Sequence, residues 1–469
     1  IKLALPKGKL LSSTASLLDE LVLGFEDYNN ETRKYRLQSV RFPHLLAKIF
    51  QERDIPIQVA IGNYDLGICG LDWIEELMVR YPTSALVRIS NLNYDEGHLY
   101  MTASCYTGIT DVHELQTREN YWRIITEYPN LAEFFALNLR LKAFKIFPVW
   151  GAAEVYPPED ADLAVLRAKD EEEIAAQNLT CLKKLLSTSA FLIANQRSLE
   201  SKDLSQILAR FTPRFVAASQ TLTTEGKPIR QKKSTVSHLP GSVKEIKLAL
   251  PDGHQQAPTS QLLKRAELEL RGYSKEMVER CPSINLDWVS IKVIRPQDMP
   301  LQVANGNFDL AITGEDWLLD HLYRFPTSPV EKLLDLNFGR VRIVAATSRD
   351  TPAANIAELR AVMQSGELSP LRVASEYVNV ADKYLRDNHI SPYRLIPTWG
   401  ASEAFLPEDA DLLIDNMQTG KTLEQHNLKI IDTLFQSTAC LIGNRESLAS
   451  PNKKRRIAFL IQKLQSALS

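Results

Sequence analysis

Short apolar runs alternate along the chain with longer amphipathic segments, a pattern that predicts strands and helices in turn. In the second half, the apolar runs predict strands at Ile246–Leu250, Ser290–Ile294, Leu310–Thr313, Val341–Ala345, Leu371–Ala374, Tyr393–Pro397, Leu412–Asp415 and Ala439–Gly443. The amphipathic segments predict helices at Ser260–Leu270, Pro300–Asn305, Ile356–Gln364, Val378–Asn388 and Lys453–Leu468. This alternation is typical of an α/β fold with mostly parallel sheets, which bind ligands at the carboxyl ends of their strands.

The chain repeats itself. Four segments return in the same order: Ile1–Pro6 as Ile246–Pro251, Asp54–Trp73 as Asp298–Trp317, Pro148–Leu163 as Pro397–Leu412, and Ser187–Leu199 as Ser437–Leu448. Because the spacing stays nearly constant, one module is used twice in tandem. The sequence predicts a first module at 1–218, a linker at 219–245 rich in Thr, Ser, Lys and Gly, and a second module at 246–469.

Composition narrows the functional class. The formal net charge of −2 does not favour a general nucleic-acid or membrane binder. The five cysteines are scattered and lack metal-ligand spacing, which fits a reducing cytoplasm, and the eight histidines form no zinc-binding pattern. No apolar run approaches the length of a membrane span, and the start of the chain predicts a strand rather than a signal peptide. We therefore expect a cytoplasmic protein without a metal site made of protein ligands alone.

A candidate phosphate-binding stretch, Asp415-Asn-Met-Gln-Thr-Gly-Lys-Thr422, follows one of the predicted strands. Gly420 permits a turn with positive φ, and the backbone N–H groups and the hydroxyls of Thr419 and Thr422 can then point at one phosphate. Lys421 adds a positive charge, while Asp415 can hold ribose hydroxyls or, through water, Mg²⁺. The alternative is an ordinary strand-to-helix turn capped by threonine. The stretch is not a Walker A loop, because the upstream glycine is missing.

Several motifs in one order resemble those of the ATP phosphoribosyltransferase family, and the resemblance covers nearly the whole chain. These motifs are the opening Ile1-Lys-Leu-Ala-Leu-Pro-Lys-Gly-Lys9, Arg295-Pro-Gln-Asp-Met-Pro300 followed by Gly306–Gly314, Leu336-Asn-Phe-Gly339 with Val341-Arg-Ile343, Ala374-Ser-Glu-Tyr377, Gly400-Ala-Ser-Glu403 and Asp415–Leu428. The resemblance implies the first reaction of histidine biosynthesis, in which ATP and phosphoribosyl pyrophosphate (PRPP) give N1-(5-phosphoribosyl)-ATP and pyrophosphate. It also implies Mg²⁺ as the cofactor.

The resemblance further implies that each module has two lobes arranged like a type II periplasmic binding protein, with the substrates in the cleft between the lobes. No counterpart of the regulatory C-terminal domain of the long family form is present, so each module is similar to the short form. That form works with a histidyl-tRNA-synthetase-like partner, which this chain could do without because another copy of the module is already attached. A homo-oligomer or an intramolecular pseudo-dimer is expected.

By the same resemblance, site residues can be assigned to each substrate. The residues expected to bind PRPP are Asp415, Thr419, Gly420, Lys421, Thr422 and Glu403. The residues expected to bind ATP are Arg295, Gly314, Lys7 and Lys9. No residue is expected to react covalently, since catalysis would come from positioning and electrostatics. Arg295 has an alternative role as an ion-pair partner of Asp298, and Glu403 could equally form a surface salt bridge.

The two modules differ at these positions. In place of the phosphate stretch the first module has Leu166-Arg-Ala-Lys-Asp-Glu-Glu-Glu173, whose four acids would repel a phosphate. The opening turn shows the reverse, since Lys7 and Lys9 correspond to Asp252 and His254. The first module is therefore not expected to bind PRPP in the manner of the family.

Three hypotheses remain open. The first module could contribute Lys7 or Lys9 to a composite site, the second module could act alone with its own cations, or both could be decayed and only bind nucleotides. A solute- or effector-binding protein is the competing class, because the same fold serves both purposes.

Overall fold

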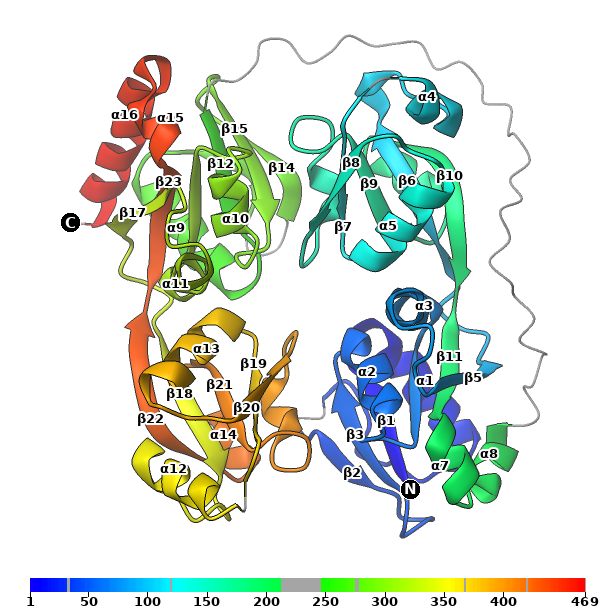
Figure 1. The fold of residues 1–469 in the computed structure, drawn as a ribbon. Coiled ribbons are helices and arrows are strands. Elements are labelled where there is room, and N and C mark those ends of the chain that lie inside the picture. Colours follow the sequence, from blue (N-terminus) through cyan, green and yellow to red (C-terminus); the bar gives the residue numbers. More distant parts are fainter. Residues whose placement is uncertain are drawn as a thin grey trace. The chain divides into compact units, whose positions relative to one another are not determined.

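The computed structural model describes residues 1–31, 34–118, 120–211, 246–274, 278–366, 368–418 and 421–468. These residues form two compact units, labelled by element in Figure 1. Unit 1 contains 1–148, 156–211 and the short segment 398–404, whereas unit 2 contains the described residues of 149–155, 246–397 and 405–468. The whole predicted linker, 219–245, lies outside the described residues, and the predicted module boundaries stay a prediction.

The first lobe of unit 1 is built on a six-stranded sheet in the order β2-β3-β1-β4-β11-β5. The strands are β1 (Lys2–Pro6), β2 (Arg36–Gln38), β3 (Leu46–Phe50), β4 (Leu66–Gly70), β5 (Leu86–Asn91) and β11 (Ala190–Asn195). The accompanying helices are η1 (Gly8–Leu10), α1 (Leu11–Glu20), η2 (Glu52–Asp54), α2 (Ile55–Ala60), α3 (Leu71–Arg80), α7 (Gln196–Ser201) and α8 (Ser205–Phe211). Strand β1 is parallel to both of its neighbours, and β11 is antiparallel to its own.

The second lobe of unit 1 has a five-stranded sheet in the order β10-β6-β9-β7-β8. The strands are β6 (Gly97–Ser104), β7 (Trp122–Thr126), β8 (Phe144–Pro148), β9 (Leu163–Ala168) and β10 (Leu179–Thr188). Its helices are η3 (Cys105–Thr107), α4 (Val112–Thr117), α5 (Pro129–Asn138) and α6 (Glu171–Ala176). Strand β7 is parallel to β8 and β9, while β6 is antiparallel to β9 and β10.

Unit 2 repeats this plan with sheets in the orders β15-β12-β16-β23-β17 and β20-β19-β21-β18-β22, plus a β13-β14 hairpin. The strands of its first lobe are β12 (Ile246–Pro251), β13 (Leu270–Tyr273), β14 (Val278–Ile284), β15 (Val289–Ile294), β16 (Leu310–Gly314), β17 (Val330–Asp335) and β23 (Ala439–Asn444). Those of its second lobe are β18 (Val341–Ser348), β19 (Leu371–Ser375), β20 (Tyr393–Pro397), β21 (Leu412–Met417) and β22 (Leu428–Ser437).

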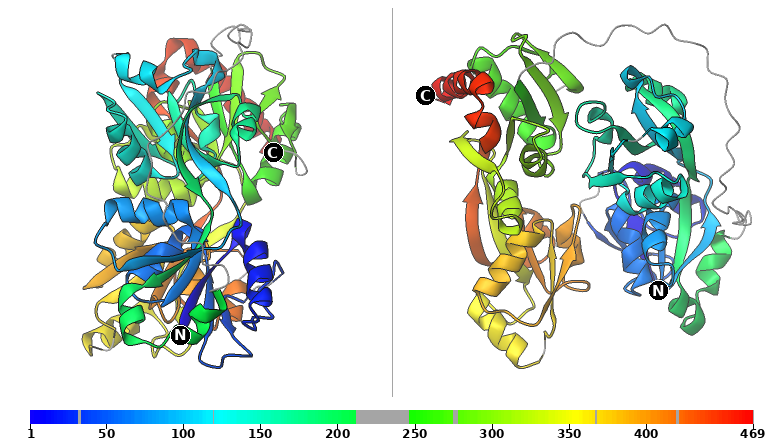
Figure 2. Two further views of the ribbon diagram at one scale, coloured as in Figure 1. Left: turned by 90° about the vertical axis from the view of Figure 1, so that its right-hand side faces the viewer. Right: turned by 45° about the horizontal axis from the view of Figure 1, so that its top comes forward.

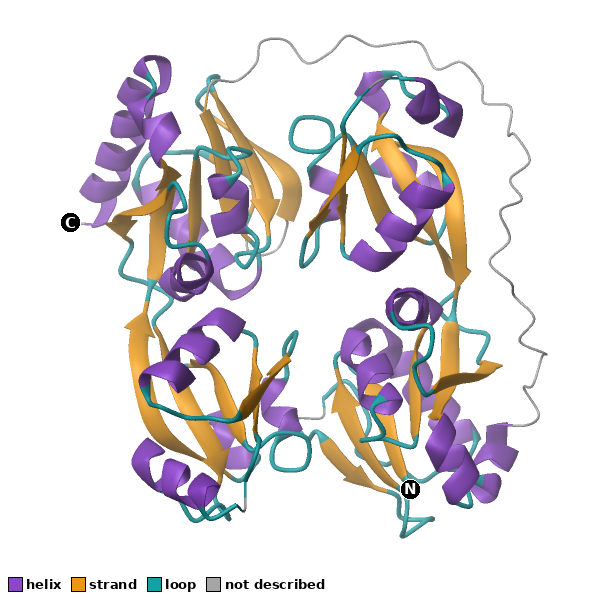
Figure 3. Cartoon of the chain, in the orientation of Figure 1, coloured by secondary structure: helices purple, strands orange, loops and turns teal. Residues whose placement is uncertain are grey.

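The helices of unit 2 follow the same plan. They are η6 (Gly253–Gln255), α9 (Gln256–Arg265), α10 (Met299–Ala304), α11 (Glu315–Arg324), α12 (Ile356–Gln364), α13 (Val378–Asp387), α14 (Lys421–Gln425), α15 (Arg445–Ala449) and α16 (Pro451–Leu468). Two short helices, η4 (Ala153–Val155) in unit 2 and η7 (Ser402–Phe405), complete the set. Figure 3 shows helices flanking the sheet of every lobe.

The chain crosses between the lobes of each unit only a few residues beyond a strand end. In unit 1 it crosses once between β5 and β6, and it returns from β10 to β11 through Ser189. In unit 2 the return from β22 to β23 passes through Thr438. The long strand pairs of this return are visible in Figures 1 and 2. Residues next to these crossings are therefore placed to touch both lobes.

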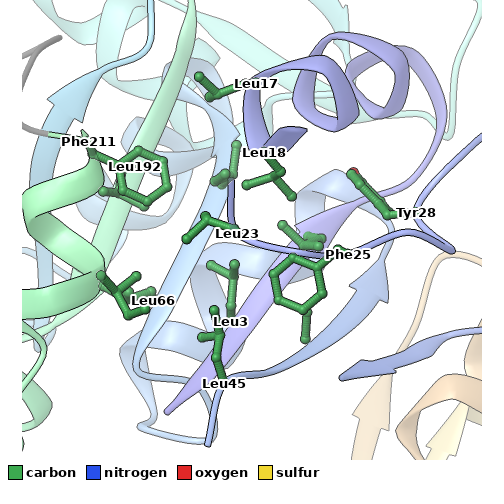
Figure 4. Close-up of a cluster of buried hydrophobic side chains, with 14 of the residues drawn as sticks. Leu3, Leu17, Leu18, Leu23, Phe25, Tyr28, Leu45, Leu66, Leu192 and Phe211 are labelled. Carbon is green, nitrogen blue, oxygen red and sulfur yellow. The ribbon is translucent and has the colours of Figure 1, made fainter. Parts of the chain in front are cut away.

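Each lobe has its own apolar core. In the first lobe of unit 1, alternate residues of β1 and β4 point their leucine and isoleucine side chains into one cluster, in which Figure 4 labels Leu3 and Leu66. Full burial of one such side chain contributes about 1.5–3 kcal/mol to folding. Comparable clusters fill the other three lobes, so each lobe is stabilised independently of the cleft.

The α/β class and the bilobed form of the two repeats are confirmed. All eight strands predicted for the second half are present, extended by at most three residues, and four of the five helices lie within two residues of their predictions. The helix predicted at Ser260–Leu270 is wrong in position, because α9 ends at Arg265 and Leu270 begins β13. The hairpin β13-β14, β17 and β22 were not predicted.

Candidate active site

The predicted phosphate stretch runs from β21 into α14 of unit 2. Strand β21 is buried at its start and presents the half-buried carboxylate of Asp415 near its carboxyl end. Thr419 and Gly420 lie outside the described residues, as do the side chains of Lys421 and Thr422, the first residues of α14. The predicted strand is thus confirmed, and the stretch leads into the short helix α14 (Lys421–Gln425). The phosphate contacts themselves stay a prediction.

The corresponding stretch of unit 1 is occupied by its own carboxylates. Asp170 precedes α6, and its side chain accepts the N–H of Glu173 at 3.0 Å, while the Glu173 carboxylate accepts the N–H of Lys169 at 2.7 Å. This reciprocal cap satisfies helix N–H groups that would otherwise face an anion, and its negative charge suits the positive end of the helix. Two of the four acids are thus already engaged by backbone N–H groups at the start of α6.

A buried hydrogen-bond network joins the lobes of unit 2 next to Asp415. The Tyr377 hydroxyl donates to Asp316 at 2.5 Å and accepts from the side-chain amide of Asn416 at 3.2 Å. The other Asp316 oxygen accepts the Ser437 hydroxyl at 2.8 Å. Trp317 stacks on the Tyr377 ring at a centroid distance of 4.2 Å. Asn416 is thus held from the first lobe through Tyr377, which fixes the strand position that follows Asp415.

The opening turn of unit 2 has lost its lysines but is surrounded by arginines. Asp252 forms ion pairs with Arg280 and Arg295, each at 3.1 Å. Arg280 also pairs with Glu154 at 3.1 Å, within the segment 149–155 that belongs to unit 2. The two guanidinium groups are balanced by the carboxylates of Asp252 and Glu154, so the turn keeps cationic groups beside it without an excess of positive charge.

Arg295, predicted to face ATP, lies against Asp252 rather than forming the alternative pair proposed with Asp298. The Asp298 carboxylate instead accepts the backbone N–H of Trp150, at 3.1 and 3.0 Å from its two oxygens. Almost half of the Arg295 side chain is exposed, so it remains accessible to an anionic ligand. The ATP role of Arg295 stays a prediction.

Gly314, also predicted to contact ATP, ends β16 and precedes α11. A Cβ atom at this position would collide with the Asp316 carboxylate. The position of the Asp316 side chain therefore requires a glycine here, whether or not a ligand approaches Gly314.

Both predicted lysines of the first module have partners within unit 1. Lys7 donates to the Tyr35 hydroxyl at 2.7 Å, and Lys9 pairs with Asp95 at 2.9 Å. Burial, and then the negative charge and hydrogen bond of Glu403, raises the pKa of Tyr35. Glu403, predicted to bind PRPP, is thus grouped with Tyr35 in unit 1. The structure brings Lys7 and Glu403 to one tyrosine and directs Lys9 elsewhere.

Unit 1 also contains a buried acidic group near the start of α3. Burial, and then the charge of Asp72, raises the pKa of Glu52 to about 8, although the N–H of Gly70 donates to its carboxylate at 2.8 Å. Burial raises the pKa of Asp54 to about 8 as well. Both carboxyl groups are therefore largely protonated at neutral pH, whereas their counterparts in unit 2 are Pro296 and Asp298.

Sequence reasoning missed Arg280 as a candidate site residue. The sequence did contain a clue to Arg280. When the first segments of the two modules are aligned, Arg280 corresponds to Tyr35 and Asp252 to Lys7. The cation has moved from the turn in unit 1 to the neighbouring strand in unit 2, and only the contact between Arg280 and Asp252 reveals the exchange.

The residues near Asp415 fit a magnesium ion carried by the substrate. Among the described residues, no group of three or more His, Cys, Asp or Glu side chains is arranged to hold a metal. Mg²⁺ characteristically uses one or two carboxylates together with substrate phosphates and water, which a single strand-end carboxylate such as Asp415 can satisfy. No helix in the described part of the chain is long and apolar enough to cross a membrane.

Comparison with known proteins gives consistent matches. The family model described as "HisG: ATP phosphoribosyltransferase" matches residues 51–213 and 295–466. An ATP phosphoribosyltransferase of Pelotomaculum thermopropionicum is 31% identical over 229 residues, covering 48% of this chain and 73% of the relative. One of Saccharolobus solfataricus is 31% identical over 232 residues, with coverage of 48% and 73%.

Among solved structures, the ATP phosphoribosyl transferase (HisG:HisZ) complex from Thermotoga maritima aligns with 23% identity and a TM-score of 0.39. That alignment covers 48% of this chain and 98% of the other. The family model matches both repeats, and each relative is matched over about the length of one repeat. The chain therefore belongs to the ATP phosphoribosyltransferase family, as a tandem duplication of its short-form module.

Proposed function

We propose that the chain joins ATP and PRPP to give N1-(5-phosphoribosyl)-ATP and pyrophosphate, the first step of histidine biosynthesis, and that this reaction takes place in the second module. The observation that carries the assignment is the contrast between the two strand-to-helix connections. Unit 2 keeps the sequence Asp415 to Thr422 after β21, whereas unit 1 has capped the same place with Asp170 and Glu173.

The reaction requires alignment and charge compensation more than covalent help. Adenine N1 attacks C1 of the PRPP ribose while the bond from C1 to the pyrophosphate oxygen breaks, and positive charge develops on the ribose. In the proposed arrangement the backbone and hydroxyls of 419–422 hold the 5′-phosphate, and Asp415 accepts hydrogen bonds from the ribose hydroxyls. Mg²⁺ bound to pyrophosphate would neutralise the leaving group.

The remaining positive charge is supplied by Arg280 and Arg295. Both now pair with Asp252, and Arg280 also pairs with Glu154. An anionic substrate entering beside them would compete for the same guanidinium groups, which are already fixed in orientation by these carboxylates. Prepositioned cations of this kind stabilise charge that develops in a transition state.

The presence of these arginines favours the hypothesis that the second module acts with its own cations. The hypothesis of a composite site now rests mainly on Lys7. Lys9 is engaged by Asp95, whereas Lys7 contacts Tyr35, which also interacts with Glu403. Joint replacement of the two lysines, considered in the Discussion, separates these hypotheses. The alternative of a decayed nucleotide- or solute-binding protein has no observation in its favour beyond the loss of the first loop.

A histidyl-tRNA-synthetase-like subunit is proposed as an optional partner. The support is the short-form length of each module and the HisG:HisZ complex among the similar structures. Activity of the chain without this subunit would support the proposal that the attached first module makes the partner unnecessary.

The test is release of pyrophosphate from ATP and PRPP by the full chain, alone and with a histidyl-tRNA-synthetase-like subunit. The paired change Lys421→Ala with Thr422→Ala should lower kcat/KM by at least about a hundredfold, because it removes charge and a hydroxyl from the phosphate site. The matched control is Glu172→Ala at the corresponding place in unit 1, which should leave activity unchanged. No turnover of the wild-type protein under either condition would refute the enzyme assignment.

A further inference from the structure

We propose that the first module holds its two lobes together by an internal ion-pair latch and thus keeps one arrangement without any substrate. The latch consists of Lys9, Asp95, Arg167 and Asp72. The second module has His, Gly and Asn in place of Lys9, Asp95 and Arg167. The duplication has therefore produced one module that is fixed and one whose lobes are free of this restraint.

The latch joins groups from both lobes of unit 1. Arg167 lies on β9 in the second lobe, Asp95 lies on the crossing between β5 and β6, and Asp72 opens α3 after the first-lobe strand β4. The Arg167 guanidinium pairs with the Asp95 carboxylate at 2.6 Å and with Asp72 at 3.6 Å, and it also donates to the Asp95 carbonyl at 2.7 Å. Lys9, from the first lobe, pairs with the other Asp95 oxygen at 2.9 Å.

The central part of the latch is shielded from water. The side chains of Arg167 and Asp95 are each 16% exposed and that of Asp72 is 2% exposed. Burial by itself would lower the pKa of Arg167, but the carboxylates of Asp72 and Asp95 raise it, so the guanidinium stays charged. Removing one member of a shielded charge pair leaves the other uncompensated, which makes the latch costly to break.

Further contacts anchor Asp72 within this cluster. Its two oxygens accept the hydroxyls of Thr188 at 3.0 Å and of Tyr128 at 2.7 Å. Thr188 ends β10 just before the return crossing, and Tyr128 precedes α5 in the second lobe. The charged groups thus sit between the two crossings, where a small rotation of one lobe would separate them.

Asp95 occupies a backbone conformation that usually belongs to glycine. Its φ of 53° is left-handed, and the corresponding residue of the second module, Gly339, has a φ of 65°. Aspartate tolerates this region better than most residues, although glycine is preferred there. The turn itself is common to both modules, and the first module adds a carboxylate to it. This Asp95 carboxylate binds both Lys9 and Arg167.

The equivalent positions of unit 2 contain Gly339, Asn416 and His254, while Asp316 retains the place of Asp72. Asp316 keeps the shared contact with a tyrosine, since Tyr377 donates to it as Tyr128 donates to Asp72. Asn416 reaches the same tyrosine as a neutral amide in place of the Arg167 charge. The contact between a tyrosine and an aspartate is therefore common to both modules, and only in unit 1 is it reinforced by a cation, Arg167.

The test introduces the residues of the second module at two positions of the first, by the double change Asp95→Gly with Arg167→Asn in the full chain. Amide hydrogen exchange is followed by mass spectrometry without ligand. We expect exchange in peptides covering 91–97 and 163–168 to become at least about tenfold faster, because local opening no longer breaks the latch. Peptides covering 335–341 and 412–417 serve as the internal control and should not change. Unchanged exchange in the first-module peptides would overturn the proposal.

The reverse change keeps the test decisive if the first variant does not fold. Gly339→Asp with Asn416→Arg and His254→Lys installs the latch in unit 2. Space is available, because a Cβ at Gly339 would lie 3.8 Å from the Ala439 side chain and 3.9 Å from that of Gln255. Exchange at 335–341 should then slow by about threefold or more, and an unchanged or faster rate would contradict the proposal. Neither measurement uses a substrate or activity, so its outcome is separate from that of the proposed reaction.

Discussion

Replacement of Tyr377 by phenylalanine tests the network beside the phosphate stretch. The change removes one hydroxyl from a side chain that is 1% exposed and leaves the packing of its ring on Trp317 in place. The buried Asp316 carboxylate loses its donor at 2.5 Å, whereas the exposed Asn416 amide loses one acceptor at 3.2 Å and keeps Asp415 at 3.3 Å. An unpaired buried polar group costs about 1–3 kcal/mol, and more when it is charged, so we expect a loss of about 3 kcal/mol.

For a unit of this size, 1 kcal/mol corresponds to about 2–4 °C in Tm, so the midpoint for unit 2 should fall by about 6–12 °C. Differential scanning calorimetry of the full chain measures this shift, and hydrogen exchange identifies the unit that unfolds. The matched variant is Tyr128→Phe in unit 1, where Asp72 keeps both the Thr188 hydroxyl and the Arg167 charge. Its expected loss is about half as large. Equal shifts in the two variants, or none in unit 2, would refute the reasoning.

Three further outcomes are expected. Lys7→Ala with Lys9→Ala should leave at least about half of the kcat/KM if the second module uses its own cations, whereas a loss of about a hundredfold or more in pyrophosphate release would favour the composite site. The pKa of Asp54 is raised to about 8 in the folded state, so its contribution to stability is full at pH below about 4 and is lost as the pH rises towards 8. Asp54→Asn should therefore make the free energy of unfolding of unit 1, measured with urea, less dependent on pH. Removal of Mg²⁺ with a chelator should abolish pyrophosphate release while leaving the Tm of the ligand-free chain unchanged, and a lowered Tm would instead indicate a built-in metal site.

The sequence was most informative where apolar patterning and repetition coincide. The strands that begin at Ile246 and Leu412 are nearly continuous apolar runs, and duplication supplied a second example of each. The end of α9 was misplaced because Leu270 continues the apolar spacing of a helix, yet it pairs with Ile284 in a hairpin. Such pairing depends on residues distant in sequence, which local spacing does not reveal.

The candidate site was predicted by residue type but not by contact. Aligning the modules exposed the change at Asp252, but the compensating position of Arg280 becomes evident only when β14 is folded beside the turn. In the same way, Asp95 and Arg167 are 72 residues apart and neither belongs to a recognisable motif. Ion pairs between such distant positions are set by sheet topology, and a single sequence contains no direct record of them.

The self-made cap at the start of α6 bears on how the two halves could change over evolutionary time. Asp170 caps α6 by accepting the backbone N–H of Glu173, so replacing Asp170 alone leaves this helix end with neither its side-chain cap nor a phosphate. Loss of an N-cap costs about 1 kcal/mol, and regaining the glycine and hydroxyls of the other module takes several further substitutions. A first module that regained the phosphate-binding stretch would therefore pass through less stable intermediates. Single mutations would not readily reverse the division of roles between the two modules.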